Sequence, residues 1–347
     1  MHLLARTSLT QWAWFLLLLS APLLFLNCTG EGNSAACGDQ STWQYQWKRI
    51  EGTRDTDFRA ASFTKGKKAW AVGTKGGIWH SKDAGDTWEK QKSGVTEDLE
   101  SVHFVDDLYG WAVGAKGVML KTEDGGKTWV KQTAVTKGTL YQVHFLDKNT
   151  GYIAGDAFTF LASNDGGNVW KSSFQPADTP LFTVQFFNTQ LGYAAGGEGL
   201  IFKTADGGSR VTNVPTGTNQ AFFSIAVTGQ SDAWAVGSSG MVRKTEDSGS
   251  SWEVYDQYVK TTQDLYGVGF VSKTTGWVVG TGGTVLGTRN TGGNWKQESP
   301  GQYPDLYGIS VNAVGGVFVG DKGAVARLKT LDKDGNEISC TLDTPAK

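Results

Sequence analysis

The sequence predicts an all-β fold built from seven copies of one unit of about 41 residues. Three landmarks recur in the copies. The first is a strand of the form Leu-x-x-Val-x-Phe, the second is a short strand ending in glycine, such as Trp-Ala-Val-Gly, and the third is a turn of the form Ser/Thr-x-Asp-x-Gly-x-Thr-Trp. One four-stranded sheet cannot bury both of its faces and must stack on neighbours. The pattern therefore predicts a seven-bladed β-propeller of four-stranded antiparallel blades.

The first two landmarks have an almost constant spacing. The first strands begin at Phe58, Leu99, Leu140, Leu181, Phe222, Leu265 and Leu306, and the second strands end at Gly73, Gly114, Gly155, Gly196, Gly237, Gly280 and Gly320. Successive glycines are 41, 41, 41, 41, 43 and 40 residues apart. Each copy then has room for two more short strands, the last of which begins at the tryptophan of the third landmark.

The third landmark resembles the Asp-box of bacterial neuraminidase repeats. Its Asp and hydroxyl side chains can accept hydrogen bonds from nearby backbone N–H groups, and its glycine permits positive φ. We therefore predict that it builds the turn between the third and fourth strands, in preference to a catalytic or metal-binding role. The members are Asp83, Trp88, Asp124, Trp129, Asp165, Trp170, Asp206 (whose copy lacks the Trp), Asp247, Trp252, Asn290 and Trp295.

The ring needs a closing strand, because the seventh copy lacks an outer strand that begins with tryptophan. Residues 43–50, Trp-Gln-Tyr-Gln-Trp-Lys-Arg-Ile, resemble such a strand. We predict that they complete the seventh blade and bring the two ends of the folded chain together. A disulfide between Cys37 and Cys340 then becomes feasible if the protein lies in an oxidising compartment.

The N-terminal residues predict export. An apolar run from Trp12 to Leu26 is too short for a membrane span and is typical of an export signal. It leads directly to Cys28, an arrangement that looks like a bacterial lipoprotein signal in which this cysteine is lipidated. Asn27 stands where Gly, Ala or Ser is usual, so an uncleaved anchor and cleavage after Ala36 remain open as alternatives.

These features give a predicted domain organisation. Residues 1–27 form a lipoprotein-type signal peptide, residues 28–42 a tether, and residues 43–347 the seven-bladed propeller. The expected location is the bacterial cell envelope, with the protein anchored to a membrane by lipid at the periplasmic or the outer surface.

Charge and composition exclude some functions. The formal net charge is −2, with 19% charged and 39% hydrophobic residues, so a core can form and the basic footprint expected for nucleic-acid binding is missing.

His103 and His144 share one position in neighbouring copies, and no third ligand accompanies them at metal spacing, so we interpret them as a repeated packing residue. No cofactor, metal site, catalytic nucleophile or distinct pair of catalytic carboxylates is predicted.

Candidate binding residues lie where the copies disagree. In a propeller, the loops joining the second to the third strand share one face with the loops that lead to the next blade, and ligands usually bind on that face. The residue after the first residue of each innermost strand varies, and five of the seven are aromatic: Arg59, Glu100, Tyr141, Phe182, Phe223, Tyr266 and Tyr307. They could surround the mouth of the central channel, but the interpretation we favour is that they fill gaps between blades.

Two loops add candidates to the same face. The loop after Gly155 departs most from its counterparts and contains Asp156 and Phe158. The longest connection between blades, residues 253–264, contains Tyr255 and Tyr258. An aromatic face of this kind suits a protein or peptide partner.

The combined pattern resembles the photosystem II stability and assembly factor family of seven-bladed propellers. The resemblance extends from Trp43 to about Asp334. Three motifs carry it in order: a strand containing Val-x-Phe, then Gly-Trp-Ala-Val-Gly, then Thr-x-Asp-Gly-Gly-x-Thr-Trp. In photosynthetic cells, members of this family are lumenal or lipid-anchored assembly factors that hold an early photosystem II subunit. The resemblance implies a non-enzymatic scaffold that binds a membrane-associated protein partner. A carbohydrate-binding or glycoside-hydrolysing propeller is the alternative hypothesis.

Overall fold

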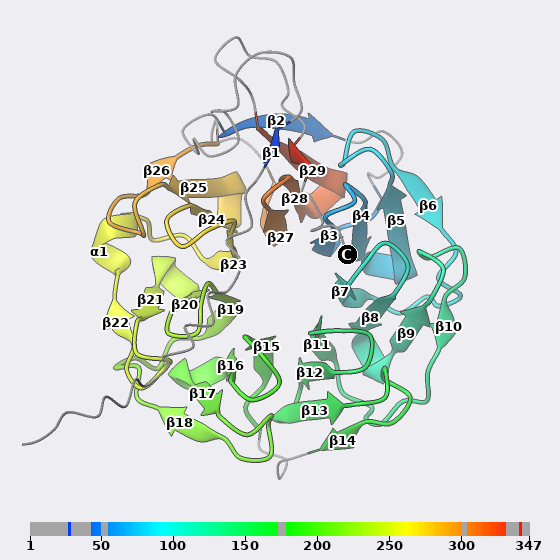
Figure 1. The fold of residues 1–347 in the computed structure, drawn as a ribbon, viewed down its shortest axis with the longest axis horizontal. Coiled ribbons are helices and arrows are strands. Elements are labelled where there is room, and N and C mark those ends of the chain that lie inside the picture. The colour runs from blue at the N-terminus through cyan, green and yellow to red at the C-terminus, as the bar shows by residue number, and fades with distance from the viewer. Residues whose placement is uncertain are drawn as a thin grey trace, which may run out of the picture.

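The computed structural model is a closed ring of seven four-stranded antiparallel sheets around a central channel (Figure 1). It describes residues 27–28, 43–49, 55–172, 178–299, 304–330 and 340–341. The predicted seven-bladed propeller is therefore confirmed. Each blade runs from an innermost strand a through strands b and c to an outermost strand d.

The blades have the following strands, in the order a, b, c, d. Blade 1 contains β3 (Phe58–Phe63), β4 (Ala69–Gly73), β5 (Gly77–Ser81) and β6 (Glu89–Gln91), and blade 2 contains β7 (Leu99–Phe104), β8 (Gly110–Gly114), β9 (Met119–Thr122) and β10 (Val130–Lys131). Blade 3 contains β11 (Leu140–Phe145), β12 (Gly151–Gly155), β13 (Thr159–Ser163) and β14 (Lys171–Ser172), and blade 4 contains β15 (Leu181–Phe186), β16 (Gly192–Gly196), β17 (Ile201–Thr204) and β18 (Thr212–Val214).

The remaining blades complete the ring. Blade 5 contains β19 (Phe222–Val227), β20 (Ala233–Gly237), β21 (Val242–Thr245) and β22 (Glu253–Val254), and blade 6 contains β23 (Leu265–Phe270), β24 (Gly276–Gly280), β25 (Thr284–Thr288) and β26 (Lys296–Gln297). Blade 7 contains β27 (Leu306–Asn312), β28 (Gly315–Gly320), β29 (Ala324–Thr330) and β2 (Trp43–Arg49). A short helix, α1 (Asp256–Val259), follows β22.

Strands b and c are joined by a short 3-10 turn in six of the blades. These turns are η2 (Thr74–Gly76), η3 (Ala115–Gly117), η4 (Gly197–Gly199), η5 (Ser238–Gly240), η6 (Thr281–Gly283) and η7 (Asp321–Gly323). Gly114, the last residue of strand b in blade 2, shows why this landmark ends in glycine. A Cβ there would lie 2.0 Å from the carbonyl oxygen of Asp98, just before strand a.

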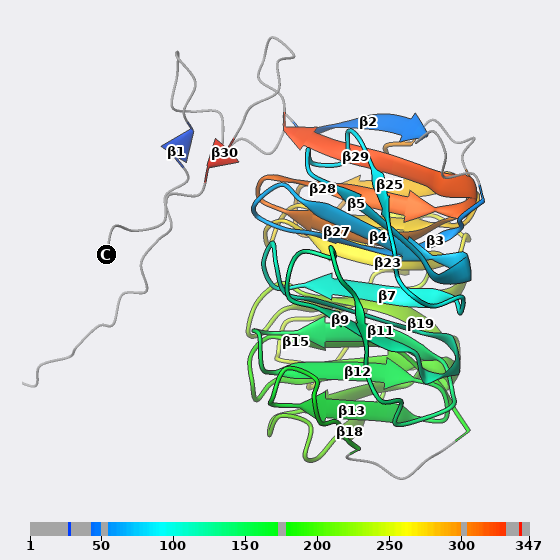
Figure 2. The ribbon, with the colours of Figure 1, turned by 90° about the vertical axis from the view of Figure 1, so that its right-hand side faces the viewer.

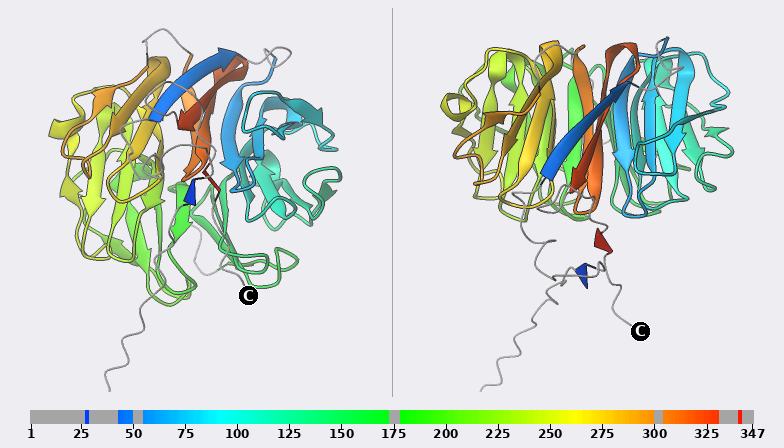
Figure 3. Two further views of the ribbon diagram at one scale, coloured as in Figure 1. Left: turned by 45° about the horizontal axis from the view of Figure 1, so that its top comes forward. Right: turned by 90° about the horizontal axis from the view of Figure 1, so that it is seen from above.

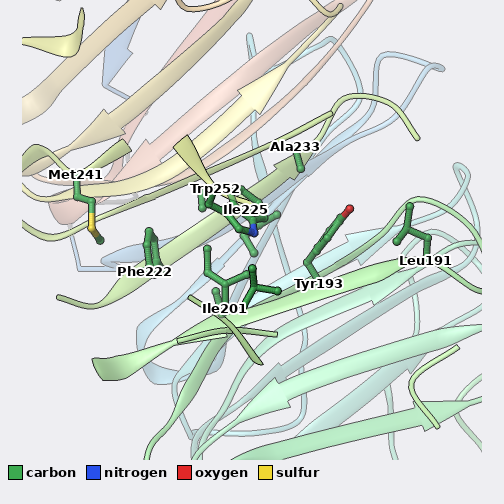
Figure 4. Packing of buried hydrophobic residues seen from close by; sticks show 11 residues of the cluster. Leu191, Tyr193, Ile201, Phe222, Ile225, Ala233, Met241 and Trp252 are labelled. Atoms are coloured by element: carbon green, nitrogen blue, oxygen red, sulfur yellow. The ribbon is translucent and has the colours of Figure 1, made fainter. Parts of the chain in front are cut away.

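The core is divided among the interfaces between blades. Strand b is buried along its whole length, because a neighbouring blade covers each of its faces. Its aromatic residue stacks on the last Phe of the next blade's strand a, with ring centroids 3.6 Å apart for Trp70–Phe104 and 3.5 Å apart for Trp111–Phe145. Figure 4 shows such an interface, where Tyr193 and Ile201 of blade 4 meet Phe222 of blade 5. Stacking of neighbours thus supplies the apolar burial that one sheet lacks.

The N-terminal strand closes the ring, as predicted. β2 pairs antiparallel with β29, from Trp43 opposite Thr330 to Arg49 opposite Ala324 (Figure 3). Blade 7 is also bonded to blade 1 beside the channel, where the Ser310 hydroxyl accepts a hydrogen bond from the Phe63 N–H at 2.9 Å.

The alternation of strand directions defines two faces. Strand a starts and strand b ends on one face, which carries the b–c turns and the connections to the next blade; we call it the mouth face. The opposite face carries the a–b and c–d turns, and we call it the Asp-box face. β29 runs from the mouth face to the Asp-box face, so both Trp43 and Thr330 lie at the Asp-box face. Figure 2 shows β1 (Asn27–Cys28) and β30 (Cys340–Thr341) beyond that end of β29.

Several predictions about the chain ends fall outside the described residues. They concern residues 1–26, Cys37 and most of the tether. Cys340 is described, and its backbone pairs with Cys28 in the antiparallel β1–β30 register. Over the described parts of the chain, helices long and apolar enough to span a bilayer are absent.

Candidate functional site at the channel mouth

The seven variable residues of strand a surround one opening at the channel mouth. A cavity of about 270 Å³ is lined by Arg59, Glu100, Tyr141, Phe182, Phe223, Tyr266 and Tyr307. We call this set the mouth ring. All seven side chains are half-buried. The structure places these residues around the channel mouth, which corrects the gap-filling interpretation favoured from the sequence.

A β-bulge in every blade produces this arrangement. In each a–b pair the register shifts between the first and third residues of strand a, for example between Leu99 and Ser101, so the second residue has no partner on strand b. A bulge re-aims the side chain of its extra residue. The sequence shows the variable position but not the bulge, which depends on pairing with strand b.

Five neighbouring members form an aromatic arc. Along Tyr141, Phe182, Phe223, Tyr266 and Tyr307, successive ring centroids are 5.1, 5.7, 5.3 and 5.1 Å apart. The guanidinium carbon of Arg59 lies 4.8 Å from the centroid of Tyr307. The arc therefore continues into a cation–π contact and leaves Glu100 between Arg59 and Tyr141.

Two tyrosine hydroxyls bind carboxylates of the b–c turns. The Tyr141 hydroxyl donates to Asp156 at 2.8 Å, and Asp156 also accepts from the Thr139 N–H at 2.7 Å. The Tyr307 hydroxyl donates to Asp321 at 3.3 Å. Burial, and then the neighbouring carboxylates, raise the pKa of each tyrosine to about 12. Both hydroxyls therefore stay protonated and act as donors at neutral pH.

Glu100 differs from the other acidic groups around the mouth. Among the described residues, its carboxylate has neither a hydrogen-bond donor nor an ion-pair partner within range. Burial raises its pKa, Arg59 lowers it, and Asp98 raises it further, with a net upward shift. A half-buried carboxylate of this kind is a group that a ligand can satisfy.

The remaining candidates of the mouth face lie outside the mouth ring. Phe158 packs edge-on against Phe202, with centroids 4.8 Å apart, at the interface between blades 3 and 4. Tyr255 packs against Trp234 at 5.1 Å, and Tyr258 packs on Tyr255 at 5.2 Å. These two tyrosines flank or belong to α1, which lies on the outer rim (Figure 1).

The histidines of the channel wall connect neighbouring blades. His103 Nδ1 accepts a hydrogen bond from the Phe145 N–H at 2.8 Å, and the rings of His103 and His144 stack at 5.0 Å. Burial lowers the pKa of His103 to about 3 and that of His144 to about 4, so both are neutral. His103 is therefore an inter-blade hydrogen-bond acceptor as well as a packing residue. The described residues contain no group of three potential ligands able to hold a metal ion.

The Asp-box residues lie on the opposite face and bind their own turns. Asp124 accepts hydrogen bonds from the Thr128 N–H at 2.9 Å and from the Thr128 and Thr122 hydroxyls at 2.6 and 2.8 Å. Trp129 is half-buried and donates to Gln91 at 3.1 Å. Burial raises the pKa of Asp124, but these hydrogen bonds lower it by a larger amount, so its pKa is lowered overall.

The other Asp-boxes repeat this geometry. The carboxylates of Asp83, Asp165, Asp206 and Asp247 and the amide oxygen of Asn290 each accept from a backbone N–H four residues later. Trp88, Trp252 and Trp295 are buried, and Trp170 is half-buried. In the fourth copy Val211 occupies the tryptophan position, yet the turn around Asp206 keeps its hydrogen bonds.

Comparison with known families gives one match over most of the chain. A family model described as photosynthesis system II assembly factor YCF48 matches residues 28–123, 132–256 and 211–289. A search of curated proteins finds no significant match.

Solved structures share the fold at low sequence identity. A structure of YCF48 bound to a D1 peptide has a TM-score of 0.69 and 18% identity, and the alignment covers 87% of this chain and 99% of that chain. YCF48 from Cyanidioschyzon merolae has a TM-score of 0.68 and 19% identity, with 82% and 98% covered. The GH74 xyloglucanase from Xanthomonas campestris has a TM-score of 0.68 and 11% identity, with 85% and 55% covered. These similarities concern the fold alone.

Proposed function

Because this chain belongs to the photosynthesis system II assembly factor YCF48 family, we propose that it is a non-enzymatic propeller that binds a protein partner at the channel mouth. The observation that carries the proposal is the mouth ring. Its aromatic arc presents five large side chains around one opening. Aromatic residues are enriched at protein interfaces because they bury much area with little loss of side-chain freedom.

The similar propeller of YCF48 was solved with a D1 peptide, which supports a peptide segment as the form of the partner. In this chain the candidate positions for such a segment are the mouth ring together with the flanking b–c turns. Asp156 and Asp321 on these turns already orient Tyr141 and Tyr307. A site with fixed side chains loses less entropy on binding than a mobile one.

A carbohydrate ligand is the second candidate function. One observation favours it: aromatic faces and a half-buried carboxylate with raised pKa, Glu100, lie at one opening. Such groups can stack on sugar rings and donate a proton in glycoside hydrolysis. The same mouth-ring variants test both candidates, because only the ligand differs.

The location follows as a further part of the proposal. We propose that residues 1–27 direct export and that Cys28 carries the lipid anchor. The chain enters the ring at Trp43 on the Asp-box face. An anchor at Cys28 would therefore attach the propeller through its Asp-box face and leave the mouth accessible to the partner.

The test compares two aromatic residues of blade 4. Phe182 lies in the mouth ring, and Phe187 is 41% exposed just after β15, on the Asp-box face. The full chain and its Phe182→Leu and Phe187→Leu variants would be used for affinity capture from detergent-solubilised membranes and for glycan-array binding. Proteins lost with Phe182→Leu but kept with Phe187→Leu support the proposal. Glycans alone with that dependence support the second candidate, and equal capture by both variants contradicts a site at the mouth.

The anchor has its own test. Cys28→Ser should move the protein from the membrane fraction to the soluble fraction and remove the lipid mass from its N-terminal peptide. Ser34→Ala, in the same segment, is the matched control. Retention of the Cys28→Ser variant in the membrane fraction would contradict lipid anchoring at Cys28.

A further inference from the structure

The mouth is surrounded by acidic groups, and their hydrogen bonds separate them into two classes. The carboxylates around the ring are Asp57, Asp98, Glu100, Asp156, Asp264, Asp305 and Asp321. Arg59 is the one basic member of the mouth ring. Lys75, Lys116 and Lys322 lie on the b–c turns, where they are exposed.

Four of these carboxylates hold b–c turns of the preceding blade. Asp98 accepts from the Lys75 N–H at 2.8 Å. Asp57, Asp264 and Asp305 accept equivalent N–H bonds at 2.9, 2.8 and 2.7 Å. Asp156 and Asp321 are bonded to tyrosine hydroxyls, as described above. Each therefore has a structural partner.

Glu100 has no such partner among the described residues, although it is half-buried. Arg59 is the neighbour of Glu100 in the ring. It stacks on Tyr307 and makes no ion pair with Glu100 in the described structure. Burial has the largest effect on the pKa of Glu100; Arg59 partly offsets it and Asp98 opposes Arg59, so the negative charge is incompletely compensated. An uncompensated carboxylate that is removed from water costs stability unless another group pairs with it.

We infer that the mouth binds a basic peptide segment of the partner, with one lysine or arginine side chain entering the ring to pair with Glu100. The inference rests on the proposed function and names its ligand class. The cation would meet Glu100 on one side and the face of Tyr141 on the other, and the ring carboxylates would favour its approach. The stem of the side chain and its apolar neighbours would lie along Phe182 and Phe223.

The charge balance favours this ligand over an acidic one. An acidic side chain could pair with Arg59 only by approaching Glu100 and Asp321, since both act electrostatically on the same part of the ring. Like charges at close range repel more strongly where water is partly excluded. A basic side chain meets one cation and several anions instead.

The experiment is a selection of peptides on the full chain, purified in detergent. A phage-displayed library of random dodecapeptides would be selected in parallel on the wild type, on Glu100→Gln and on Phe182→Leu. Glu123→Gln is the matched control, because Glu123 lies in the Asp-box turn of the same blade and pairs with Lys121 at 2.9 Å. Selected peptides would be synthesised, with and without replacement of each basic residue by norleucine, and their affinities measured by calorimetry.

The expected result is enrichment of lysine or arginine in the selected peptides. Glu100→Gln should weaken their binding about tenfold, as should replacement of one basic residue, whereas Glu123→Gln leaves it unchanged. The two losses should not add, because they remove the same contact. Thermal unfolding of each variant would verify that it is folded.

The other outcomes distinguish this inference from the proposed function. Peptides that lose binding with Phe182→Leu but contain no required basic residue, or that ignore Glu100→Gln, overturn the basic-ligand inference and leave the mouth as a protein-binding site. Peptides indifferent to both variants, or no selected peptides at all, overturn the mouth as a peptide-binding site.

Discussion

The Asp-box face and the channel mouth contain the same kinds of side chain in opposite situations. On the Asp-box face, the carboxylate of each Asp-box is surrounded by donors of its own turn, and hydrogen bonds lower its pKa, as for Asp124. At the mouth, burial raises the pKa of Glu100, and the described residues offer it no donor. The first arrangement stabilises the fold, whereas the second costs stability unless a ligand pairs with the carboxylate.

The repeat itself follows this division. Residues that bind within their own turn recur from blade to blade, as Asp83, Asp124 and Asp165 do. Residues of the mouth ring share a position and a bulge but not an identity. Functional residues in a repeat protein are therefore better sought at positions that have the same backbone structure in every repeat but a different residue in each.

Loss of ring closure should destabilise the protein more than any other change, because both faces depend on the closed ring. A chain lacking residues 1–50 loses β2 and leaves β29 as an unpaired edge, with seven paired positions removed. Since the whole stability of a domain is about 5–15 kcal/mol, we expect this chain to be insoluble or to unfold below 37 °C. A chain lacking only residues 1–42 is the control and should keep the wild-type Tm. Equal Tm values for the two truncated chains would contradict closure by β2.

The Asp-box comes next in size. Asp124→Ala removes three hydrogen bonds from an exposed turn and should destabilise the protein by about 1–2 kcal/mol, or roughly 2–6 °C in Tm. Asp124→Asn should cost less, because Asn290 fills the same position in blade 6 and accepts from the Asn294 N–H at 2.9 Å. Differential scanning calorimetry measures both. A larger loss for Asn than for Ala would contradict the turn-building role.

Sequence patterns predicted the scaffold well because seven copies of each motif identify strands and turns that a single copy would leave uncertain. The seven strand starts and the variable position on each innermost strand were available from spacing, and the closing strand of residues 43–50 from its likeness to the outer strands. The β-bulge at Leu99–Ser101 and the lack of a donor near Glu100 were not, because both depend on which strands and blades meet. The position of Tyr255 could not be predicted for the same reason: its ring packs on Trp234 at the outer rim and does not line the mouth.

Glu100→Gln should act in the opposite direction to Asp124→Ala. Its pKa is raised in the fold, so ionisation of Glu100 costs stability as pH rises through that pKa, whereas below the unfolded value of about 4.5 the cost is absent. The groups that face it are Arg59 of β3, Asp98 before β7 and Tyr141 of β11. We expect Glu100→Gln to raise Tm by about 1–3 °C at pH 7.5 and to leave it unchanged at pH 4. A lower Tm at pH 7.5 would mean that Glu100 has a stabilising partner.

The tyrosine hydroxyls should give the smallest effects and the finest comparison. Tyr141→Phe removes a 2.8 Å bond to Asp156 and should cost about 1 kcal/mol, while Tyr307→Phe removes a 3.3 Å bond to Asp321 and should cost less than about 0.5 kcal/mol. Asp156 keeps the Thr139 N–H as a donor. Asp321 loses a hydrogen bond that lowers its pKa.

Carboxyl NMR titration separates these two cases even where stability hardly changes. Tyr307→Phe should raise the pKa of Asp321, which is already raised by burial and by Asp57, so that its ionisation begins at higher pH than in the wild type. Tyr258→Phe, at the outer rim, is the matched control and should leave that titration unchanged. If Tyr307→Phe also left it unchanged, the Tyr307 hydroxyl would not be bonded to Asp321 in solution. The mouth would then be less ordered in the free protein, and its ligand would have to fix the aromatic arc on binding.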